Sequence, residues 1–317
     1  MTGVSHGKVI LFGEHAVVHG VPAIAVGIER GASATSLVLG SGPSTLSVRA
    51  WDTRVTSEGD DSPLGRAFRD LVAETRNEAL AIDVTVELPP GGGLGCSAAL
   101  GVAIARALDP AANDETVIAR ASVWERVFHG NPSGIDVACA ALGGCVQFTR
   151  TESAALIDRV RVPGLFHLCI GNTGQPSSTK TMVEAVGRQL ERRPDTTKRT
   201  FEAIRTLVSN ARLAIEAGDR RAVGQLLDLN QMLLSGLFVS TPEIEQMCAT
   251  ARVAGASGAK LTGAGGGGSV VALVDSPEIG GAVLTAWKAD GYDGFLTTFG
   301  TSDLVRHVPE PMIQGAP

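Results

Sequence analysis

The sequence has no run of basic residues, no Cys-x-x-Cys pair and no long apolar segment. Its net charge of −6 argues against a nucleic-acid-binding protein, because such proteins neutralise phosphates with clustered Lys and Arg. Its five cysteines are an odd number and lie mostly in apolar stretches, which favours reduced, buried thiols. No segment reaches the roughly 18 apolar residues of a membrane-spanning helix, and the start MTGVSHGKVILFGEH does not resemble a signal peptide. We therefore expect a cytoplasmic protein without a nucleic-acid or membrane partner.

Glycine is abundant, with 39 residues that gather in clusters rather than spreading evenly. Clustered Gly marks places where the backbone turns sharply or approaches another group closely. With 317 residues, 44% of them hydrophobic, the chain is long enough for two globular domains. We expect these domains at residues 1–165 and 166–317, and the sequence leaves open whether the chain forms a homodimer.

The pattern of apolar residues predicts strands and helices that do not alternate regularly. Strands are predicted at 7–13, 21–28, 33–40, 84–90, 143–150, 166–174 and 294–299. Helices are predicted at 62–80, from about 97 to 108, and at 114–129, 178–192, 197–217, 219–236, 242–254 and 277–289. Asp114 is the expected N-cap of one helix and Gly130 the residue that ends it. This order favours the α+β class over a doubly wound parallel sheet.

The glycine loop at 91–97 is the first candidate site. Successive glycines let backbone N–H groups converge, and the positive end of the following helix points at them, which together favour a phosphate. A plain helix-capping turn is the alternative. The loop lacks the Gly-Lys-Ser/Thr triplet of a P-loop, and it lacks the βαβ setting of a dinucleotide-binding fingerprint. The sequence therefore indicates a phosphate loop of another kind.

Two carboxylates follow this loop. The turn at 131–134 delivers Asp136 on rigid backbone, where it could accept a hydroxyl proton or serve only as a helix N-cap. Glu125 lies 11 residues earlier in a largely apolar helix. It could be a metal ligand, or it could lie on a solvated face of the helix.

Three polar residues accompany the first strand. Lys8 begins an apolar strand, where a cation is out of pattern and often pairs with a carboxylate or phosphate, although it could also be a surface lysine. Glu14 and His15 follow the glycine that ends this strand, well placed to contact a substrate. A second glycine cluster at 262–268 carries a high entropic cost, which favours close approach of a ligand or chain segment over a plain flexible loop.

Three separated motifs, in matching order and spacing, resemble the GHMP family of small-molecule kinases over nearly the whole chain. They are GKVILFGEHAVVHGVPAIAV (7–26), PPGGGLGCSAA (89–99) and KLTGAGGGGSV (260–270), and HGNPSGID (129–136) and NTGQPSSTK (172–180) agree with them. The resemblance implies an N-terminal domain like the second domain of ribosomal protein S5 and a ferredoxin-like C-terminal domain, with ATP, Mg²⁺ and substrate between them. GEHAVVHG resembles the branch of the family that phosphorylates the 5-hydroxyl of mevalonate.

The resemblance also implies a role for each matching residue. Asp136 resembles the catalytic carboxylate, and Lys8 resembles the lysine that orients it and acidifies the hydroxyl. Ser97 and Glu125 match the Mg²⁺ ligands. The expected ATP-binding loop comprises Pro90, Gly91, Gly92, Gly93, Leu94, Gly95, Cys96, Ser97 and Ala98. The expected residues near the substrate are Glu14, His15, Ser133, Thr179, Gly263 and Ala264.

Three residues depart from the family pattern. Cys96 stands where a first serine is usual, so only Ser97 can supply a hydroxyl ligand, while Val137 replaces a common Asn and His19 a common Tyr. These departures leave the chemistry intact but leave the acceptor open. A sibling kinase acting on phosphomevalonate, galactose or homoserine would share every phosphate-binding feature. A non-catalytic nucleotide or sugar sensor is the alternative from another class.

Overall fold

The computed structural model describes residues 1–73, 79–89, 91–129, 134–151 and 155–301. Its strands form three sheets. A five-stranded sheet has the order β1 (Thr2–Val4), β4 (Ala32–Val38), β7 (Leu80–Val86), β5 (Thr45–Val48) and β6 (Thr53–Thr56). A second sheet has the order β2 (Gly7–Phe12), β3 (Ala23–Ile28), β8 (Cys145–Arg150) and β9 (Ala155–Arg159). The third has the order β11 (Gly258–Thr262), β12 (Ser269–Val274), β10 (Gly164–Asn172) and β13 (Asp293–Thr301).

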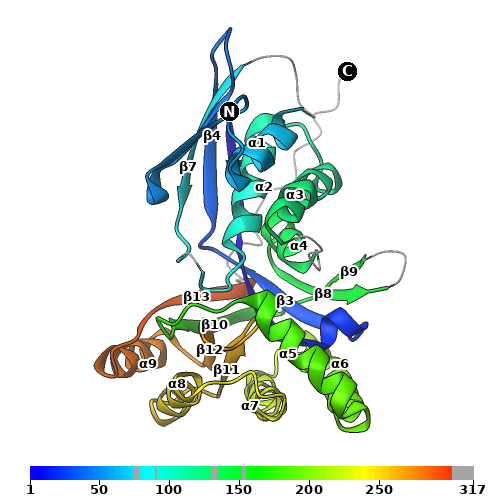
Figure 1. Cartoon of the computed structure of the whole chain (residues 1–317). Coiled ribbons are helices and arrows are strands. Elements are labelled where there is room, and N and C mark those ends of the chain that lie inside the picture. The colour runs from blue at the N-terminus through cyan, green and yellow to red at the C-terminus, as the bar shows by residue number, and fades with distance from the viewer. Residues whose placement is uncertain (74–78, 90, 130–133, 152–154, 302–317) are drawn as a thin grey trace, which may run out of the picture.

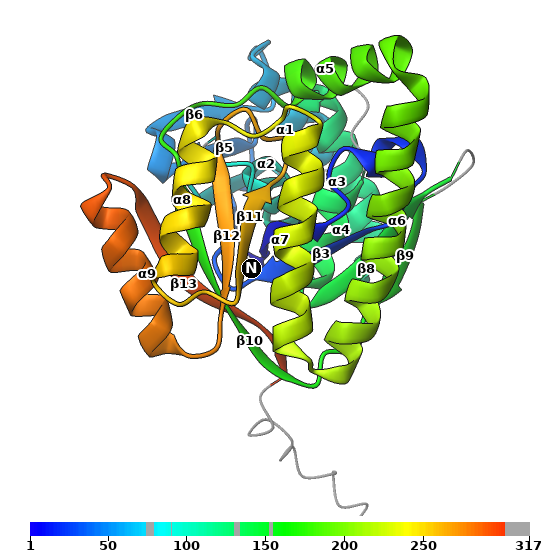
Figure 2. The ribbon, with the colours of Figure 1, turned by 90° about the horizontal axis from the view of Figure 1, so that it is seen from below.

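Helices pack against the five-stranded sheet and against the sheet that contains β10–β13. Helices α1 (Pro63–Ala73) and α2 (Cys96–Leu108) pack on the five-stranded sheet, and α3 (Asp114–His129) packs on these two helices (Figure 1). Helix α4 (Ile135–Leu142) packs on β2 and β3. The later helices are α5 (Thr179–Arg192), α6 (Pro194–Ala217), α7 (Arg220–Gly236), α8 (Pro242–Val253) and α9 (Pro277–Ala289). Seen from below, α7 and α8 lie across β11 and β12 (Figure 2). The sheet containing β2 and β3 lies between the two parts and contacts both. Within the described residues, no helix is long and apolar enough to span a membrane.

The α+β class is confirmed, because helices and mainly antiparallel strands occur without regular alternation. One prediction was wrong in detail: residue 80 was placed in a helix, but β7 begins there. Leu80, Ile82 and Val84 are buried at every second position, which is the period of a strand. The strands β1, β5, β6, β9, β11 and β12 and the helix α4 were not among the predicted elements. The predicted domain division after residue 165 falls within β10 and stays a prediction.

The cap of α3 also differs from the prediction. Asn113, not Asp114, caps this helix, since its Oδ1 accepts a hydrogen bond from the Thr116 amide at 2.9 Å. Asp114 is the first helical residue and pairs with Arg106 at 2.8 Å. The predicted terminating residue, Gly130, lies outside the described residues. Asn and Asp satisfy a free helix amide equally well, so the sequence alone did not separate these neighbours.

Close packing of α2 against α3 positions the candidate site. Gly101 on α2 lies directly under the buried Trp124 ring, where an added Cβ would come within 2.7 Å of the ring. The Trp124 indole N–H donates to the Ser97 carbonyl at 3.0 Å, which ties α3 to the first turn of α2. This contact places the next residue of α3, Glu125, against the start of α2.

We expect Gly101→Ala to lower the free energy of unfolding by about 1–3 kcal/mol, because the new methyl group overpacks the α2–α3 contact. Gly187→Ala on α5 is the matched control. A Cβ at that helical position meets nothing within 4 Å. There the same change should stabilise the fold by roughly 0.5–1 kcal/mol. Urea denaturation of both variants measures the difference, and effects of equal sign would contradict the packing described.

Candidate functional site

The glycine loop before α2 has its carbonyls tied back to the protein. The Gly92 carbonyl accepts from Ser269 Oγ at 2.7 Å, the Gly93 carbonyl from Lys8 Nζ at 3.3 Å, and the Leu94 carbonyl from the Lys8 amide at 2.8 Å. Among the described residues, none accepts a hydrogen bond from the amides of residues 93–97. The loop therefore presents unpaired amides at the positive end of a 13-residue helix, an arrangement that suits an anion.

Gly95 provides the turn from this loop into α2. It is the N-cap residue, with φ +73°, and no side chain caps the helix. A Cβ at this position would come within 3.3 Å of the Lys8 Cβ. Glycine is required here both for the left-handed backbone and for the close approach of β2. Helix α2 starts at Cys96, within one residue of the predicted start.

Lys8 and Asp136 form an ion pair beside this loop, 2.6 Å apart. Lys8 starts β2, and its side chain is 5% exposed, while the Asp136 carboxylate is 36% exposed. Burial opposes the charge on Lys8, but the adjacent Asp136 outweighs it and raises the pKa of Lys8 above its ordinary value. Gly134 caps α4, so Asp136 is not the N-cap that one reading allowed. The pair thus presents a carboxylate, backed by a buried cation, at the phosphate loop.

Ser97 and Glu125 form the second polar pair of the site. The Ser97 hydroxyl lies beside the Glu125 carboxylate, yet Ser97 Oγ and Glu125 Oε1 are buried without a well-formed hydrogen bond among the described residues. Burial raises the pKa of the Glu125 carboxyl, and the negative charge of Asp136 raises it further. His129 lies 3.6 Å from the other carboxylate oxygen. Two unsatisfied oxygens next to the glycine loop are the kind of ligands that a hard cation uses.

Glu14 and His15 lie at the other end of β2, and their environments differ. The Glu14 carboxylate is fully buried, with an ion pair from Lys260 to one oxygen and a hydrogen bond from Asn230 Nδ2 to the other, at 3.1 Å. Both of its oxygens are therefore committed to the protein. Burial lowers the pKa of His15 to about 4, so its imidazole is neutral at pH 7. His15 Nε2 must then donate to the Ala264 carbonyl, 2.8 Å away, which leaves Nδ1 as a buried acceptor without a described partner.

The second glycine cluster packs against both the phosphate loop and other chain segments. A Cβ on residues 265, 266 or 267 would come within 2.1–2.8 Å of Val239, Met182 or Gln175, respectively. A Cβ on Gly263 would lie 3.7 Å from the Gly93 carbonyl oxygen. Close approach of chain segments thus accounts for these glycines, and the cluster supports the phosphate loop from the C-terminal sheet.

The other predicted site residues lie in different environments. Thr179 is exposed at the start of α5 and makes no hydrogen bond to another predicted site residue in the part of the chain that the structure describes. Cys96 is half-buried, and burial raises the pKa of its thiol to about 11, so it remains a neutral thiol. Pro90 and Ser133 lie outside the described residues. The roles predicted for all these residues stay predictions.

Three contributors to the site were not predicted. Lys260 is buried in β11, Asn230 is buried in α7, and the Thr262 hydroxyl bonds both the amide and the carbonyl of Ile10 at 3.0 Å. The run GAKLT places a lysine inside an apolar strand, which is the same signal that singled out Lys8. That signal could have identified Lys260, whereas nothing in the sequence near Asn230 would have done so.

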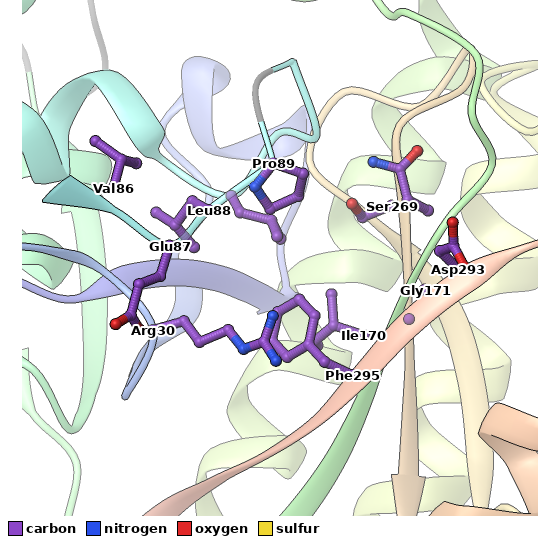
Figure 3. Close-up of a pocket in the computed structure, with 13 residues that line it drawn as sticks. Arg30, Val86, Glu87, Leu88, Pro89, Ile170, Gly171, Ser269, Asp293 and Phe295 are labelled. Carbon is purple, nitrogen blue, oxygen red and sulfur yellow. The ribbon is translucent and has the colours of Figure 1, made fainter. Parts of the chain in front are cut away.

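A cavity of about 360 Å³ lies next to the start of the glycine loop (Figure 3). It shares Pro89 and Leu94 with the loop region, but its lining includes none of Lys8, Asp136 and Glu125. Arg30 lies over the Phe295 ring at 4.0 Å and contributes to one wall. The cavity is therefore separate from Lys8, Asp136 and Glu125, although Ser269, which bonds the Gly92 carbonyl, also lines it.

Comparison with known proteins gives one consistent result. Two family models match the chain, the GHMP kinases N terminal domain at residues 63–144 and the GHMP kinases C terminal at residues 211–293. The chain is 32% identical to the mevalonate kinase of Pyrococcus abyssi, with 92% of each chain covered. It is 34% identical to that of Methanothermobacter thermautotrophicus, over 89% of this chain and 93% of the relative. The solved structure of L. major mevalonate kinase in complex with R-mevalonate is 30% identical, with a TM-score of 0.84 and coverage of 95% of this chain and 96% of its own.

Proposed function

This chain belongs to the GHMP kinase family, and on that premise we propose that it transfers the γ-phosphoryl group of ATP to the 5-hydroxyl of mevalonate. The two-domain GHMP kinase fold expected from the resemblance is confirmed. The observation that carries the proposal is the Lys8–Asp136 pair, 2.6 Å apart, directly beside a loop of unpaired amides. The mevalonate kinases that it matches along nearly their whole length support mevalonate as the acceptor.

The phosphate loop would bind the triphosphate of ATP. Phosphoryl transfer depends on positioning and on neutralising charge, more than on covalent chemistry by the protein. The unpaired amides of residues 93–97 and the positive end of α2 supply both, and the tied carbonyls keep the amides in place. Because these donors are fixed before ATP arrives, little reorganisation is needed at the moment of transfer.

Asp136 and Lys8 would act on the acceptor alcohol. The partly exposed carboxylate of Asp136 orients the hydroxyl and receives its proton, while the buried Lys8 ammonium stabilises the negative charge that develops on the oxygen. Lys8 also donates to the Gly93 carbonyl at 3.3 Å, so one side chain links the acceptor end to the phosphate loop. This link would set the distance between the alcohol and the transferred group.

Ser97 and Glu125 fit a Mg²⁺ site. Among the described residues, no group of three or more His, Cys, Asp or Glu side chains could hold a metal ion. Mg²⁺ does not need one, since it commonly takes one or two protein ligands and completes its shell with water and phosphate oxygens. The unsatisfied Ser97 Oγ and Glu125 Oε1 are suitable ligands. Bound Mg²⁺ would neutralise charge on the phosphates of ATP.

The acceptor can be tested by measuring ADP release with mevalonate, phosphomevalonate, galactose and homoserine. We expect mevalonate to give a kcat/KM at least about tenfold above the other three, because a site built for one polar acceptor rejects analogues that leave its groups unpaired. A higher kcat/KM with another acceptor would reassign the substrate within the family. No ADP release with any of the four would contradict the kinase proposal itself.

A further inference from the structure

A buried ion pair joins the C-terminal sheet to the end of β2. Lys260 in β11 and Glu14 after β2 are both fully buried, although 246 residues separate them in the sequence. The Lys260 ammonium also donates to the Leu261 carbonyl, and Asn230 donates to the free Glu14 oxygen at 3.1 Å. Buried pairs of this kind add little net stability, because both charges lose their hydration. Their contribution is more often a fixed geometry.

The pair belongs to a set of three contacts between β11 and β2. Lys260, Thr262 and Ala264 are alternate residues along β11 and its extension, and they contact Glu14, Ile10 and His15, respectively. The pairing of β2 with β3 shifts register between Ile10 and Phe12, and the Thr262 hydroxyl bonds both backbone groups of Ile10 at that irregularity. The end of β2 is therefore aligned by the C-terminal sheet.

His15 depends on this alignment. Its φ is +61° and its ψ is −47°, a combination outside the left-handed helical region that costs energy for a residue with a side chain. Its backbone follows Glu14 directly, and its ring is bonded to the Ala264 carbonyl at 2.8 Å. A strained residue keeps one conformation only when several contacts with its neighbours hold it there. The Lys260–Glu14 pair and the Ala264 carbonyl are the neighbours that do so here.

We propose that Lys260 is a positioning residue, which acts through Glu14 to hold His15 with its unpaired Nδ1 as a hydrogen-bond acceptor for the alcohol substrate. This proposal rests on the proposed function, since it assumes that the substrate is a hydroxyl compound that binds beside His15. It also reassigns Glu14, whose two oxygens are occupied by Lys260 and Asn230, from a substrate contact to part of the support.

Lys260→Met tests the proposal, because methionine keeps the length of the side chain and removes the ammonium. We expect the KM for mevalonate to rise by about tenfold or more, since a small displacement of a substrate-binding group is costly. The KM for ATP should stay within about twofold, because the phosphate loop is held by other bonds. Lys288→Met is the control, since Lys288 is 73% exposed and pairs with Asp293 at the surface.

A second measurement is independent of catalysis. Burial has the largest effect on the pKa of His15 and lowers it, the hydrogen bond to the Ala264 carbonyl raises it, and the charges of His19 and Lys260 lower it by smaller amounts. We expect the pKa of His15, measured by NMR, to be higher in Lys260→Met than in the wild-type protein, mainly because a ring that is no longer held against the Ala264 carbonyl becomes less buried. The NMR signal of the His15 imidazole is assigned by its absence from the spectrum of His15→Gln. If mevalonate is not the acceptor, the kinetic comparison fails in the wild-type protein, but the imidazole measurement still tests the positioning.

A folded Lys260→Met protein with a wild-type KM for mevalonate and a wild-type imidazole pKa would overturn the proposal. Equal increases in the KM for mevalonate and for ATP would also overturn it, because they indicate a general structural loss. If the single variant does not fold, Glu14→Gln combined with Lys260→Met removes both buried charges. Positioning predicts a raised KM for mevalonate in that double variant, and a wild-type KM there contradicts it.

Discussion

Replacing Asp136 by asparagine is expected to lower kcat by on the order of 10²–10⁴-fold while leaving the KM for ATP nearly unchanged. Asparagine keeps the shape of the side chain but cannot receive a proton. It also removes the charge that lies 2.6 Å from Lys8 Nζ. Because burial opposes the charge on Lys8, and Asp136 is what raises its pKa, the lysine should lose affinity for its proton in the variant. The lost proton acceptor and the lowered pKa of Lys8 both weaken activation of the acceptor hydroxyl. Neither change removes an amide of residues 93–97, which would bind the phosphates.

Steady-state kinetics with ATP and mevalonate, together with a nucleotide-binding titration, measure this effect. Asp83→Asn is the control, because Asp83 is an exposed residue that pairs with Arg49 at the surface. It should leave both kinetic constants as they are in the wild-type protein. Retained turnover in Asp136→Asn would remove Asp136 from the chemistry, and lost ATP binding would show that the residue acts through the loop instead.

Replacing Glu125 by glutamine is expected to raise the Mg²⁺ concentration needed for half-maximal activity by roughly 10–100-fold. The carboxylate is 2% exposed, and one of its oxygens has no well-formed hydrogen bond among the described residues. Glutamine fills the same space without the charge. Glu115→Gln, an exposed position in the first turn of the same helix, is the control. An unchanged Mg²⁺ titration would remove Glu125 from the metal site.

Although Glu125→Gln should weaken Mg²⁺-dependent activity, it should stabilise the fold when Mg²⁺ is absent. Burial raises the pKa of Glu125, so this group stabilises the fold below its unfolded-state pKa, and that stability is lost as the pH rises through the folded-state value. The ionised form of this carboxylate is therefore unfavourable in the absence of a cation. We expect Glu125→Gln to have the higher Tm without Mg²⁺, and to gain less Tm than the wild-type protein when Mg²⁺ and ATP are added. Thermal unfolding with and without these ligands measures both.

Much of the site was accessible from local sequence signals. Lys8 interrupts an apolar strand, the glycines at 91–95 precede an Ala-rich helix, and Asp136 follows a strong turn sequence. Each of these signals concerns a few neighbouring residues, and local conformation depends mainly on such neighbours. The start of α2 was predicted for this reason, whereas Lys260 carried the same signal as Lys8 but was not singled out.

Two features of the structure were not foreseen, for related physical reasons. Glu14 was expected near a substrate, which stays a prediction, but the contacts of its carboxylate with Lys260 and Asn230 come from distant parts of the chain. The segment containing Leu80 has the alternation of a strand, yet it was assigned to the preceding helix, whose described end is Ala73. In the first case the deciding contact is tertiary, and in the second the boundary is set by which sheet the segment joins.

The sequence by itself determined the glycine loop before α2, the family and the residue types available for chemistry, because these depend on local backbone requirements and on short ordered motifs. The tertiary structure decided which charges meet. It paired Lys8 with Asp136, buried Glu14 against Lys260, and left Nδ1 of His15 and Oγ of Ser97 without described partners. Side chains far apart in the chain interact only after packing has brought them together and removed water from between them, and no local pattern specifies which pairs those will be.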